Sequence, residues 1–285
     1  MRAEIGIVGG SGLYDAREIS GLEEVSLSTP FGEPSGPYAV GEMEGRKVAF
    51  LARHGRGHRL APGEINFRAN IYGFKLLGVE RILSAGAVGS MKESIHPTHL
   101  VFPDQFVDLT KGRPSSFFGQ GLVAHVAFAD PVCPVLRAHA AASARAAGAT
   151  VHDGGAYVCI EGPQFSTRAE SNIYRSWGVS VIGMTNVQEA KLAREAEICY
   201  ATMALVTDFD CWHVSEQPVT VEALLDSLRA NAATARRVIA RAVASLPARS
   251  CGCGTALRDA LITDPGVVPA PVRERLAPIV GKYLA

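Results

Sequence analysis

The sequence lacks any long hydrophobic run. None of its apolar segments approaches the roughly 18 consecutive apolar residues that a membrane-spanning helix needs. Near the amino terminus, the apolar run over residues 5–8 is four residues long and is interrupted by glycine, which is too short for the core of a signal peptide. We therefore expect a cytoplasmic protein with no membrane partner.

A net charge is also missing, because 28 Lys and Arg residues balance 28 Asp and Glu residues. A balanced chain has no long-range attraction to nucleic acid or to an anionic membrane surface. Any phosphate group must therefore be held by a local site. We expect small-molecule ligands and no nucleic-acid partner.

Cysteine is scarce, with six residues in 285, which is too few for a disulfide scaffold and, without an export signal, typical of a reduced protein. Cys251 and Cys253 are separated only by Gly252. A structural zinc site needs four ligands, and no His or Cys pair nearby in the sequence supplies the other two. We interpret both as free thiols in a C-terminal turn, with a disulfide as the less favoured alternative, and expect no metal site.

Short apolar runs alternate with helical patterns along the chain, whose apolar share of 47% and charged share of 20% are ordinary for a globular protein. Runs that are apolar on both faces predict buried strands. We expect strands over 4–10, 47–55, 81–89, 100–109, 156–162, 179–185 and 200–210. We expect helices over 65–78, 133–148, 167–178, 188–197 and 219–246. This alternation predicts an α/β fold with a mixed, largely parallel central sheet flanked by helices.

No internal repeat and no low-complexity segment divides the chain, so residues 1–285 are expected to form a single domain. Pro247 ends the last long helix. The remainder, about 248–285, is expected to be a small helical extension with a short helix near 255–263. Residues 112–128 are expected to form a long loop, and such loops are usually functional or contact a neighbour.

Polar or unusual residues recur at the carboxyl ends of the expected strands. They are Ser11, Arg53, a glycine turn over 86–89, Phe165, Thr185 and Asp208. In open α/β sheets, ligands bind outside the carboxyl ends of the strands. We therefore expect one pocket lined by these six segments.

The glycine turn around Ser11 resembles the start of a dinucleotide-binding fingerprint. The match is incomplete, because Asp15 occupies the position of the third glycine. What remains is either a small anion-binding nest or a plain turn. Arg53 and His54 follow the second strand, and an arginine can hold two phosphate oxygens with its planar fork of donors. The alternative for Arg53 is a surface ion pair.

Phe165 follows a Gly-Pro turn, where an aromatic ring can stack on a flat ligand or plug the core. Met184, beside Thr185, admits the same two interpretations. Asp208 and Asp210 are two residues apart, so on an extended chain both carboxylates leave the same face. Two buried acids cannot both ionise cheaply, so one pKa should rise and leave a proton donor. The alternative is a turn with solvated acids.

Eight ordered blocks of sequence resemble the trimeric purine nucleoside phosphorylase family. They are GGSGL, TPFGEPS, LARHG, INFRANIY, FPDQFVDLT, IEGPQFSTRAE, GMTNVQEAKLARE and CYATMALVTDFDCW, and they run from about residue 4 to 245. The most similar branch is the one that acts on 5′-methylthioadenosine. That branch often carries Thr where this chain has Ser11 and Gly86.

The resemblance implies phosphorolysis, in which phosphate attacks C1′ of a purine nucleoside and releases the base and a ribose 1-phosphate. It implies that the phosphate is bound by Ser11, Arg53, His54 and Thr185. It implies substrate contacts from Gly86, Ala87, Phe165, Met184 and Asp210, and a proton donated to N7 of the base by Asp208. It further implies an apolar 5′ pocket at Val221 and Leu224, and a homotrimer in which His125 reaches the adjacent subunit's substrate.

Inorganic phosphate is then a co-substrate, and no cofactor is implied. A carboxylate pair accepts from the 6-amino group of adenine, whereas an asparagine at position 208 would suit a 6-oxo group. Adenosine, 5′-deoxyadenosine and 6-oxopurine nucleosides remain alternative substrates. Hydrolysis by water and binding without chemistry are the alternative functions.

Overall fold

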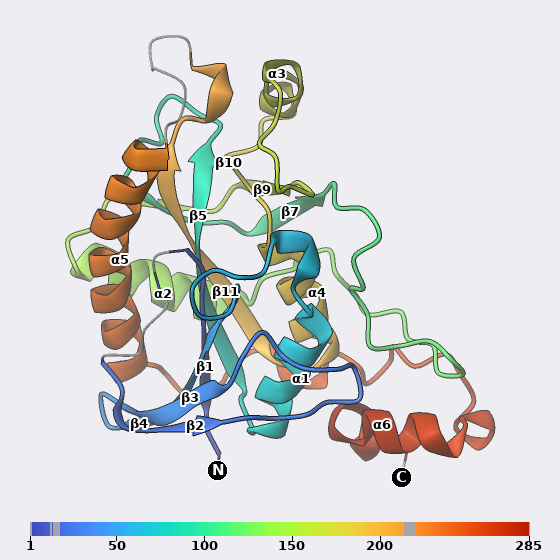
Figure 1. Ribbon diagram of the computed structural model, residues 1–285. Helices are drawn as coiled ribbons and strands as arrows, with labels where there is room; N and C mark the ends of the chain where they lie inside the picture. The colour runs from blue at the N-terminus through green and yellow to red at the C-terminus, as the bar shows by residue number, and fades with distance from the viewer. Residues whose placement is uncertain (1, 12, 14–17, 214–220, 285) are drawn as a thin grey trace.

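The computed structural model describes residues 2–11, 13, 18–213 and 221–284, without the side chains of 221–226. In this part of the chain, eleven strands form one sheet with helices on both faces (Figure 1). The strands are β1 (Ile5–Gly9), β2 (Ser20–Val25), β3 (Tyr38–Met43), β4 (Arg46–Ala52), β5 (Arg81–Ser90), β6 (Leu100–Phe102), β7 (Gln105–Asp108), β8 (Val151–Asp153), β9 (Ala156–Cys159), β10 (Val181–Gly183) and β11 (Cys199–Asp208). The α-helices are α1 (Phe67–Leu76), α2 (Pro134–Ala146), α3 (Arg168–Ser176), α4 (Asn186–Glu195), α5 (Val221–Ala244) and α6 (Ala270–Val280).

The centre of the sheet is parallel. Strands β4, β1, β5 and β11 lie side by side, with Ile5 of β1 opposite Val48 of β4 and Arg81 of β5. Antiparallel pairing joins β2 to β3, β3 to β4, β5 to β10 and β6 to β11. Every residue of β1 and all but the last of β11 are buried, which is why these strands appear as continuous apolar runs in the sequence. The expected fold class is therefore confirmed.

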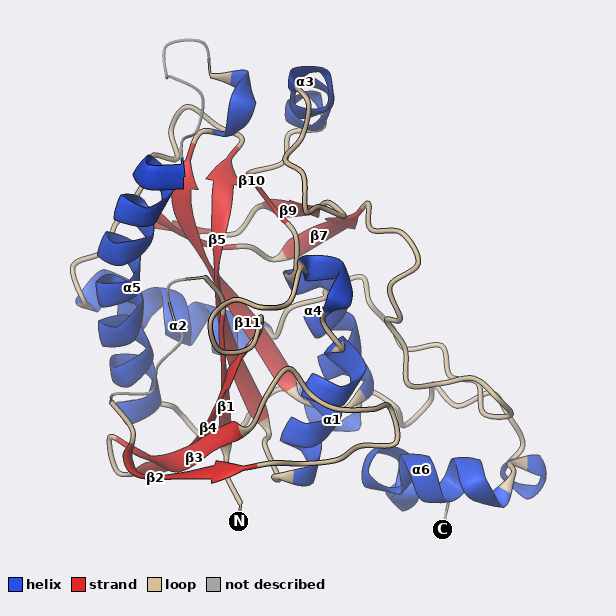
Figure 2. Ribbon diagram, in the orientation of Figure 1, coloured by secondary structure: helices blue, strands red, loops and turns tan. Residues whose placement is uncertain are grey.

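Helices cover the two faces of the sheet with separate hydrophobic cores (Figure 2). On one face, α2 and α5 pack together through residues such as Leu136 and Val238. On the other face, α1, α4 and α6 share a core that includes Phe74, Leu192 and Leu276. A sheet buried on both faces leaves its strand ends as the natural place for a ligand.

Two predicted elements differ from the structure. The strand expected over 100–109 is two strands, because the chain leaves the first at Pro103 and bends at Asp104. Strand β6 pairs with β11 and β8, while β7 pairs with β9. The helix expected near 255–263 consists of a 3-10 turn (Gly252–Thr255) and further turns. The C-terminal helix is instead α6, whose pattern is masked in the sequence by Pro271 in its first turn and Pro278 in its interior. Strands β2, β3 and β8 were not predicted.

The C-terminal extension packs against the rest of the fold. Leu257 and Leu276 belong to the same core as α1 and α4. The expected loop over 112–128 is present, and it is tied to this extension by a bond from the His125 amide to the Ala260 carbonyl, 2.8 Å long, and by a bridge between Ala124 and Leu261. Within the described residues, no helix is both long enough and apolar enough to cross a membrane.

Candidate active site

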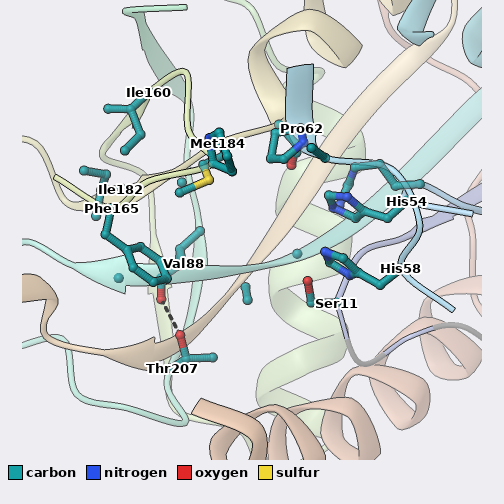
Figure 3. A pocket seen from close by; sticks show the side chains of 18 of the residues that line it. Ser11, His54, His58, Pro62, Val88, Ile160, Phe165, Ile182, Met184 and Thr207 are labelled. Atoms are coloured by element: carbon teal, nitrogen blue, oxygen red, sulfur yellow. Dashed lines mark hydrogen bonds between the residues drawn. The ribbon is translucent and has the colours of Figure 1, made fainter. Parts of the chain in front are cut away.

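A cavity of about 530 Å³ opens at the carboxyl ends of the central strands. This volume lies within the usual range for a small-molecule site. Figure 3 shows His54 and His58 on one side of the cavity and Phe165 and Val88 on the other. The sequence-predicted residues that line it are Ser11, Arg53, His54, Gly86, Ala87, Phe165, Met184, Thr185, Asp208 and Asp210. The prediction of one pocket fed by six segments is confirmed.

Three predicted site residues are not brought to this cavity by the described structure. His125 lies in the 112–128 loop and is not among the described residues that line the cavity of its own chain. Val221 and Leu224 belong to the start of α5, but their side chains lie outside the described residues. Leu228, farther along α5, does line the cavity. Gly12, which follows Ser11 in the glycine turn predicted there, also lies outside the described residues.

Residues 86–89 were predicted to form a glycine turn, and this prediction is wrong, because they belong to strand β5. The small size of the two glycines serves close packing. A Cβ atom on Gly86 would lie 3.1 Å from Nη1 of Arg53, and one on Gly89 would lie 3.0 Å from Oδ1 of Asp208. Glycine at these positions therefore lets the two charged side chains lie directly against the strand.

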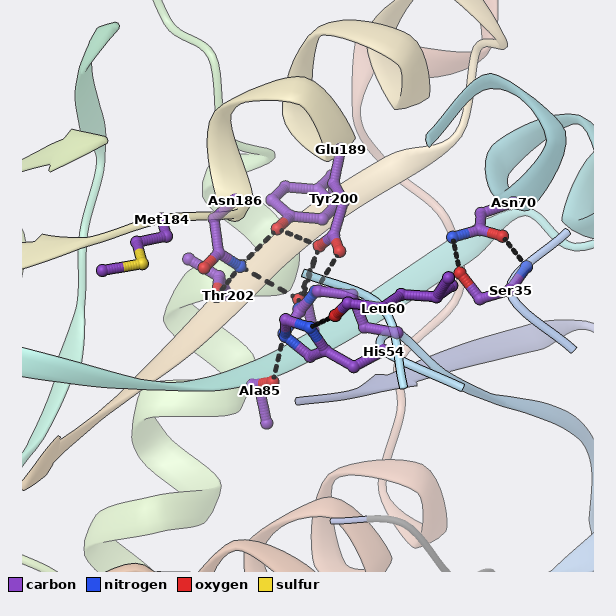
Figure 4. Close-up of polar contacts among 12 residues, drawn as sticks. Ser35, His54, Leu60, Asn70, Ala85, Met184, Asn186, Glu189, Tyr200 and Thr202 are labelled. Atoms are coloured by element: carbon purple, nitrogen blue, oxygen red, sulfur yellow. Dashed lines mark hydrogen bonds and ion pairs between the residues drawn. The ribbon is translucent and has the colours of Figure 1, made fainter. Parts of the chain in front are cut away.

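We call the part of the cavity formed by Arg53, His54, Ser11 and Thr185 its basic end. Arg53 is 1% exposed, and its Nε donates over 2.5 Å to Oε1 of Glu189, which Figure 4 shows beside Tyr200. Glu189 also accepts from Nη2 of Arg53, from the Ser84 hydroxyl and from the Tyr200 hydroxyl. A buried ion pair is tolerated only when its remaining polar atoms are satisfied, and this one is embedded in such a network.

The network leaves Arg53 with little to offer a ligand. A guanidinium carries five N–H donors. Nε–H is used by Glu189, the two Nη2 hydrogens face Glu189 and Ser84, and one Nη1 hydrogen faces the Ala85 carbonyl. One Nη1 hydrogen remains. The Nε–H and Nη2–H pair of the guanidinium is directed at Glu189, so Nη1 is the donor that remains for a ligand, and phosphate binding by Arg53 stays a prediction.

His54 is neutral in this environment. Its Nδ1 lies 2.9 Å from the Leu60 carbonyl oxygen, which can only accept, so Nδ1 carries the ring proton. Burial, followed by the positive charge of Arg53, lowers the pKa of His54 to about 4. Nε2 is then an acceptor. A phosphate oxygen that faces Nε2 must carry a proton, or the ring must gain one when the anion binds.

We call the part formed by Asp208 and Asp210 the acidic end. Asp208 closes β11, and its carboxylate accepts from the Thr207 hydroxyl over 2.7 Å and from the Asp210 amide over 2.8 Å. Burial is the largest influence and raises the pKa of Asp208; the charge of Asp210 raises it further, while the two hydrogen bonds oppose the rise. A carboxyl group with a raised pKa keeps its proton to higher pH and can donate it.

Asp210 lines the cavity, but the backbone that places it there is not the extended chain that was predicted. The chain is not extended between the two acids: the strand ends at Asp208, and Asp210 starts a 3-10 turn (Asp210–Trp212) with a φ of 54°. A positive φ in a residue other than glycine costs about 1–3 kcal/mol and needs support from its surroundings. Here the Ser171 hydroxyl of α3 donates to Oδ2 of Asp210 over 2.5 Å. Burial raises the pKa of this carboxyl as well.

Phe165 lies in the loop before α3, and the residue is 67% exposed although it lines the cavity. This exposure contradicts the core-plug alternative and leaves the ring face open to a flat ligand. Met184 packs closely against the Gly162 backbone, where a Cβ atom would lie 2.5 Å from its sulfur. The thioether thus forms part of the cavity wall between β10 and the Phe165 loop.

Sequence reasoning missed several functional neighbours. Glu189 lies 136 residues from Arg53 in the sequence, and no local pattern pairs them. His58, Arg59 and Pro62 line the cavity just after Arg53. The density of His, Arg and Gly in that stretch was the available signal for His58 and Arg59.

A family model described as the phosphorylase superfamily matches residues 4–244 of the chain. An S-methyl-5′-thioadenosine phosphorylase of Koribacter versatilis is 60% identical over 99% of this chain and 97% of that protein. One from Geobacter sulfurreducens is 55% identical over the full length of both.

Solved structures agree with these relatives. A methylthioadenosine phosphorylase sourced from an Antarctic soil metagenomic library superposes with a TM-score of 0.93 at 49% identity, over 98% of this chain and 99% of that one. A methylthioadenosine phosphorylase from Schistosoma mansoni in complex with adenine gives a TM-score of 0.85 at 33% identity, over 98% of both chains. The likeness therefore includes the C-terminal extension as well as the central sheet.

Proposed function

The chain belongs to the phosphorylase superfamily, and on that basis we propose that it catalyses the phosphorolysis of 5′-methylthioadenosine. The products are adenine and 5-methylthioribose 1-phosphate. This makes the protein a pentosyltransferase of purine and methionine salvage. The observation that carries the proposal is that one cavity has a hydrogen-bonding basic end, a buried acidic end and an exposed aromatic ring, Phe165, in its lining.

The chemistry of the reaction matches the two ends of the cavity. Cleavage of the N-glycosidic bond builds positive charge on the sugar and negative charge on the leaving base. A phosphate at the basic end stabilises the sugar cation and attacks C1′. A protonated Asp208 donates to N7 of the base, which the raised pKa of this carboxyl supports. In this proposal phosphate is a co-substrate, and neither an organic cofactor nor a catalytic metal takes part.

Phosphate binding at the basic end depends on directed hydrogen bonds more than on net charge. Arg53 is already neutralised by Glu189, and His54 is uncharged. The remaining Nη1 hydrogen of Arg53 and the hydroxyls of Ser11 and Thr185 are the donors that we assign to the anion. Phe165 stacks on the purine, and Asp210 accepts from its 6-amino group.

The 6-amino preference follows from the acidic end. Asp210 accepts from the Ser171 hydroxyl through Oδ2, and we assign its other oxygen, Oδ1, to the purine 6-amino group. A 6-oxo purine would place an acceptor against this carboxylate. A mismatch between buried polar groups costs about 1–3 kcal/mol or more. Leu228, with Val221 and Leu224 as predicted, favours an apolar 5′ substituent.

We also propose a homotrimer in which a neighbouring subunit completes each site through His125. Two observations support this assembly. Phe165 stays largely exposed beside the cavity, and His125 is not among the described residues that line the cavity of its own chain. Sedimentation or light scattering would give the mass of three chains, or of six if trimers pair. A His125→Ala variant should keep that mass while the KM for nucleoside rises.

One assay tests the proposed reaction. Methylthioadenosine, adenosine, 5′-deoxyadenosine and inosine are each incubated with the enzyme, with and without phosphate, and the released base and sugar phosphate are measured. We expect methylthioadenosine to be consumed only with phosphate. Equal turnover without phosphate would indicate a hydrolase, faster cleavage of inosine would contradict the role of the acidic end, and binding without product would indicate a module that lacks chemistry.

A further inference from the structure

Four of the six cysteines meet at one point of the fold, far from the cavity. They are Cys133, Cys199, Cys251 and Cys253, and we call them the cysteine cluster; each offers a sulfur atom, and all four sulfurs lie within 4.8 Å of one another. Cys133 and Cys199 are buried, and the other two are half-buried. No second pair of ligands lies near Cys251 and Cys253 in the sequence, but the fold supplies one, because it brings in two cysteines from distant segments.

The spacing of the sulfurs fits one tetrahedral ion. A Zn–S bond of about 2.3 Å gives sulfur-to-sulfur edges of about 3.8 Å. The sulfurs of Cys199 and Cys251 are 3.2 Å apart, well beyond a covalent S–S bond, and no pair exceeds 4.8 Å. Four sulfurs within this span leave room at their centre for a single ion. A set of four sulfur ligands in a tetrahedron is typical of zinc.

The surroundings of the cysteine cluster favour negative charge on sulfur. Cys133 is the N-cap of α2, and its sulfur accepts from the Leu136 amide over 3.5 Å, so the positive end of a helix faces it. The guanidinium of Arg249 lies beside the sulfurs of Cys199 and Cys251. Its Nε is buried and has no hydrogen-bond partner among the described residues. A thiolate is a far better acceptor for that N–H than a thiol or a disulfide.

We propose that the cysteine cluster binds one structural Zn²⁺ ion through four thiolates. Binding displaces the thiol protons to solvent and changes no oxidation state, so no oxidant is needed. Four thiolates and one Zn²⁺ leave two negative charges on the site, which the α2 N-terminus and Arg249 offset. All four positions are filled by protein, which is the arrangement of a structural and not a catalytic zinc.

The ion would join three segments that are distant in sequence. Cys133 precedes α2, Cys199 begins β11, and Cys251 and Cys253 belong to the turn that opens the C-terminal extension. That extension in turn holds the 112–128 loop through the bond between His125 and Ala260. Zinc at the cysteine cluster would therefore anchor the C-terminal extension to the rest of the fold. Through the extension it would also hold the 112–128 loop in place.

The test uses the full-length protein, purified without chelators from cells supplied with zinc. We expect about one zinc per chain by elemental mass spectrometry, and no disulfide among the four cysteines after alkylation and peptide mapping. A Cys253→Ser variant should lose most of this zinc and unfold at a lower temperature. Cys159→Ala is the matched control, since Cys159 is a buried cysteine outside the cysteine cluster, and it should retain the zinc.

Cobalt substitution keeps the test decisive if the serine variant does not fold. Wild-type protein loaded with Co²⁺ should show the absorption bands of a tetrahedral cobalt tetrathiolate, and a mercurial reagent should release the ion as the thiols react. A reduced, folded wild type that takes up neither zinc nor cobalt would overturn the proposal. So would disulfides linking these cysteines in the freshly isolated protein, or iron as the bound metal.

Discussion

The two ends of the cavity hold buried charge in different ways. At the basic end, Arg53 is paired with Glu189, and both side chains are at most 2% exposed. At the acidic end, Asp208 has no ion-pair partner among the described residues, and burial shifts its pKa upward. The basic end neutralises the charge of Arg53 with a counter-ion, Glu189. The acidic end avoids a charge on Asp208 by favouring its protonated form.

The difference fits the roles that we propose for the two ends. A phosphate binds and leaves as an anion, so a rigid, already neutral set of donors can hold it without binding it too tightly. A leaving base needs a proton at one moment of the reaction, which a fixed counter-ion beside the acid would prevent by stabilising the carboxylate. The comparison can be tested at each end.

The largest effect is expected from Asp208→Asn, which removes the proton donor and keeps the shape of the acidic end. We expect kcat with methylthioadenosine to fall by about 10²- to 10⁴-fold. Relative use of 6-oxo nucleosides should improve, because an amide can donate to a 6-oxo purine. Steady-state kinetics with both substrate types measure this, and Asp259→Asn, at an exposed position, is the control. An unchanged substrate preference would contradict the role of Asp208.

Glu189→Gln breaks the counter-ion of the basic end. Removing one partner of a buried pair leaves the other charge uncompensated, so we expect a loss of about 3–5 kcal/mol in the free energy of unfolding. Phosphate should stabilise this variant more than it stabilises the wild type, since the anion replaces the missing charge. Denaturant unfolding with and without phosphate measures both effects. Glu93→Gln, on an exposed side chain, should change stability by no more than about 1 kcal/mol.

The pH dependence of the rate separates the two ends. In the proposed mechanism Asp208 acts in its acid form. Because its pKa is raised, kcat/KM should be retained to higher pH than an ordinary carboxyl allows and then fall about tenfold per pH unit. His54, with a pKa of about 4 in the unliganded protein, is neutral across this range and adds no further limb there. The falling limb should be absent in Asp208→Asn. A rate that rises with pH over the same range would contradict proton donation.

The smallest effect is expected from Gly86→Thr, which introduces the hydroxyl that related sequences often carry. The new Cβ would lie 3.1 Å from Nη1 of Arg53, which the Glu189 network holds in place. We expect crowding to outweigh the added donor and to cost about 1 kcal/mol, or roughly a fivefold rise in the KM for phosphate. Gly86→Ala separates crowding from the hydroxyl. A phosphate KM below that of the wild type would show that the basic end adapts.

Much of the site could be predicted because its residues follow strands. The apolar runs at β1, β4, β5 and β11 are long enough to be recognised, and a parallel sheet places their carboxyl ends together. Ser11, Arg53, Thr185 and Asp208 were found in this way. Edge strands were missed where exposure removes the apolar signal: β2 is almost entirely exposed.

The sequence by itself determined the central strands, the helices α1 to α5, and which polar residues stand where those strands end, because burial and periodicity follow from neighbouring residues. Only the tertiary structure decided that the Arg53 guanidinium pairs with Glu189 and that Asp210 adopts a left-handed backbone conformation at the cavity. It also decided that the sulfurs of four cysteines lie close together. Each of these depends on segments that are distant along the chain or on a backbone angle set by packing. No local pattern of residues carries that information.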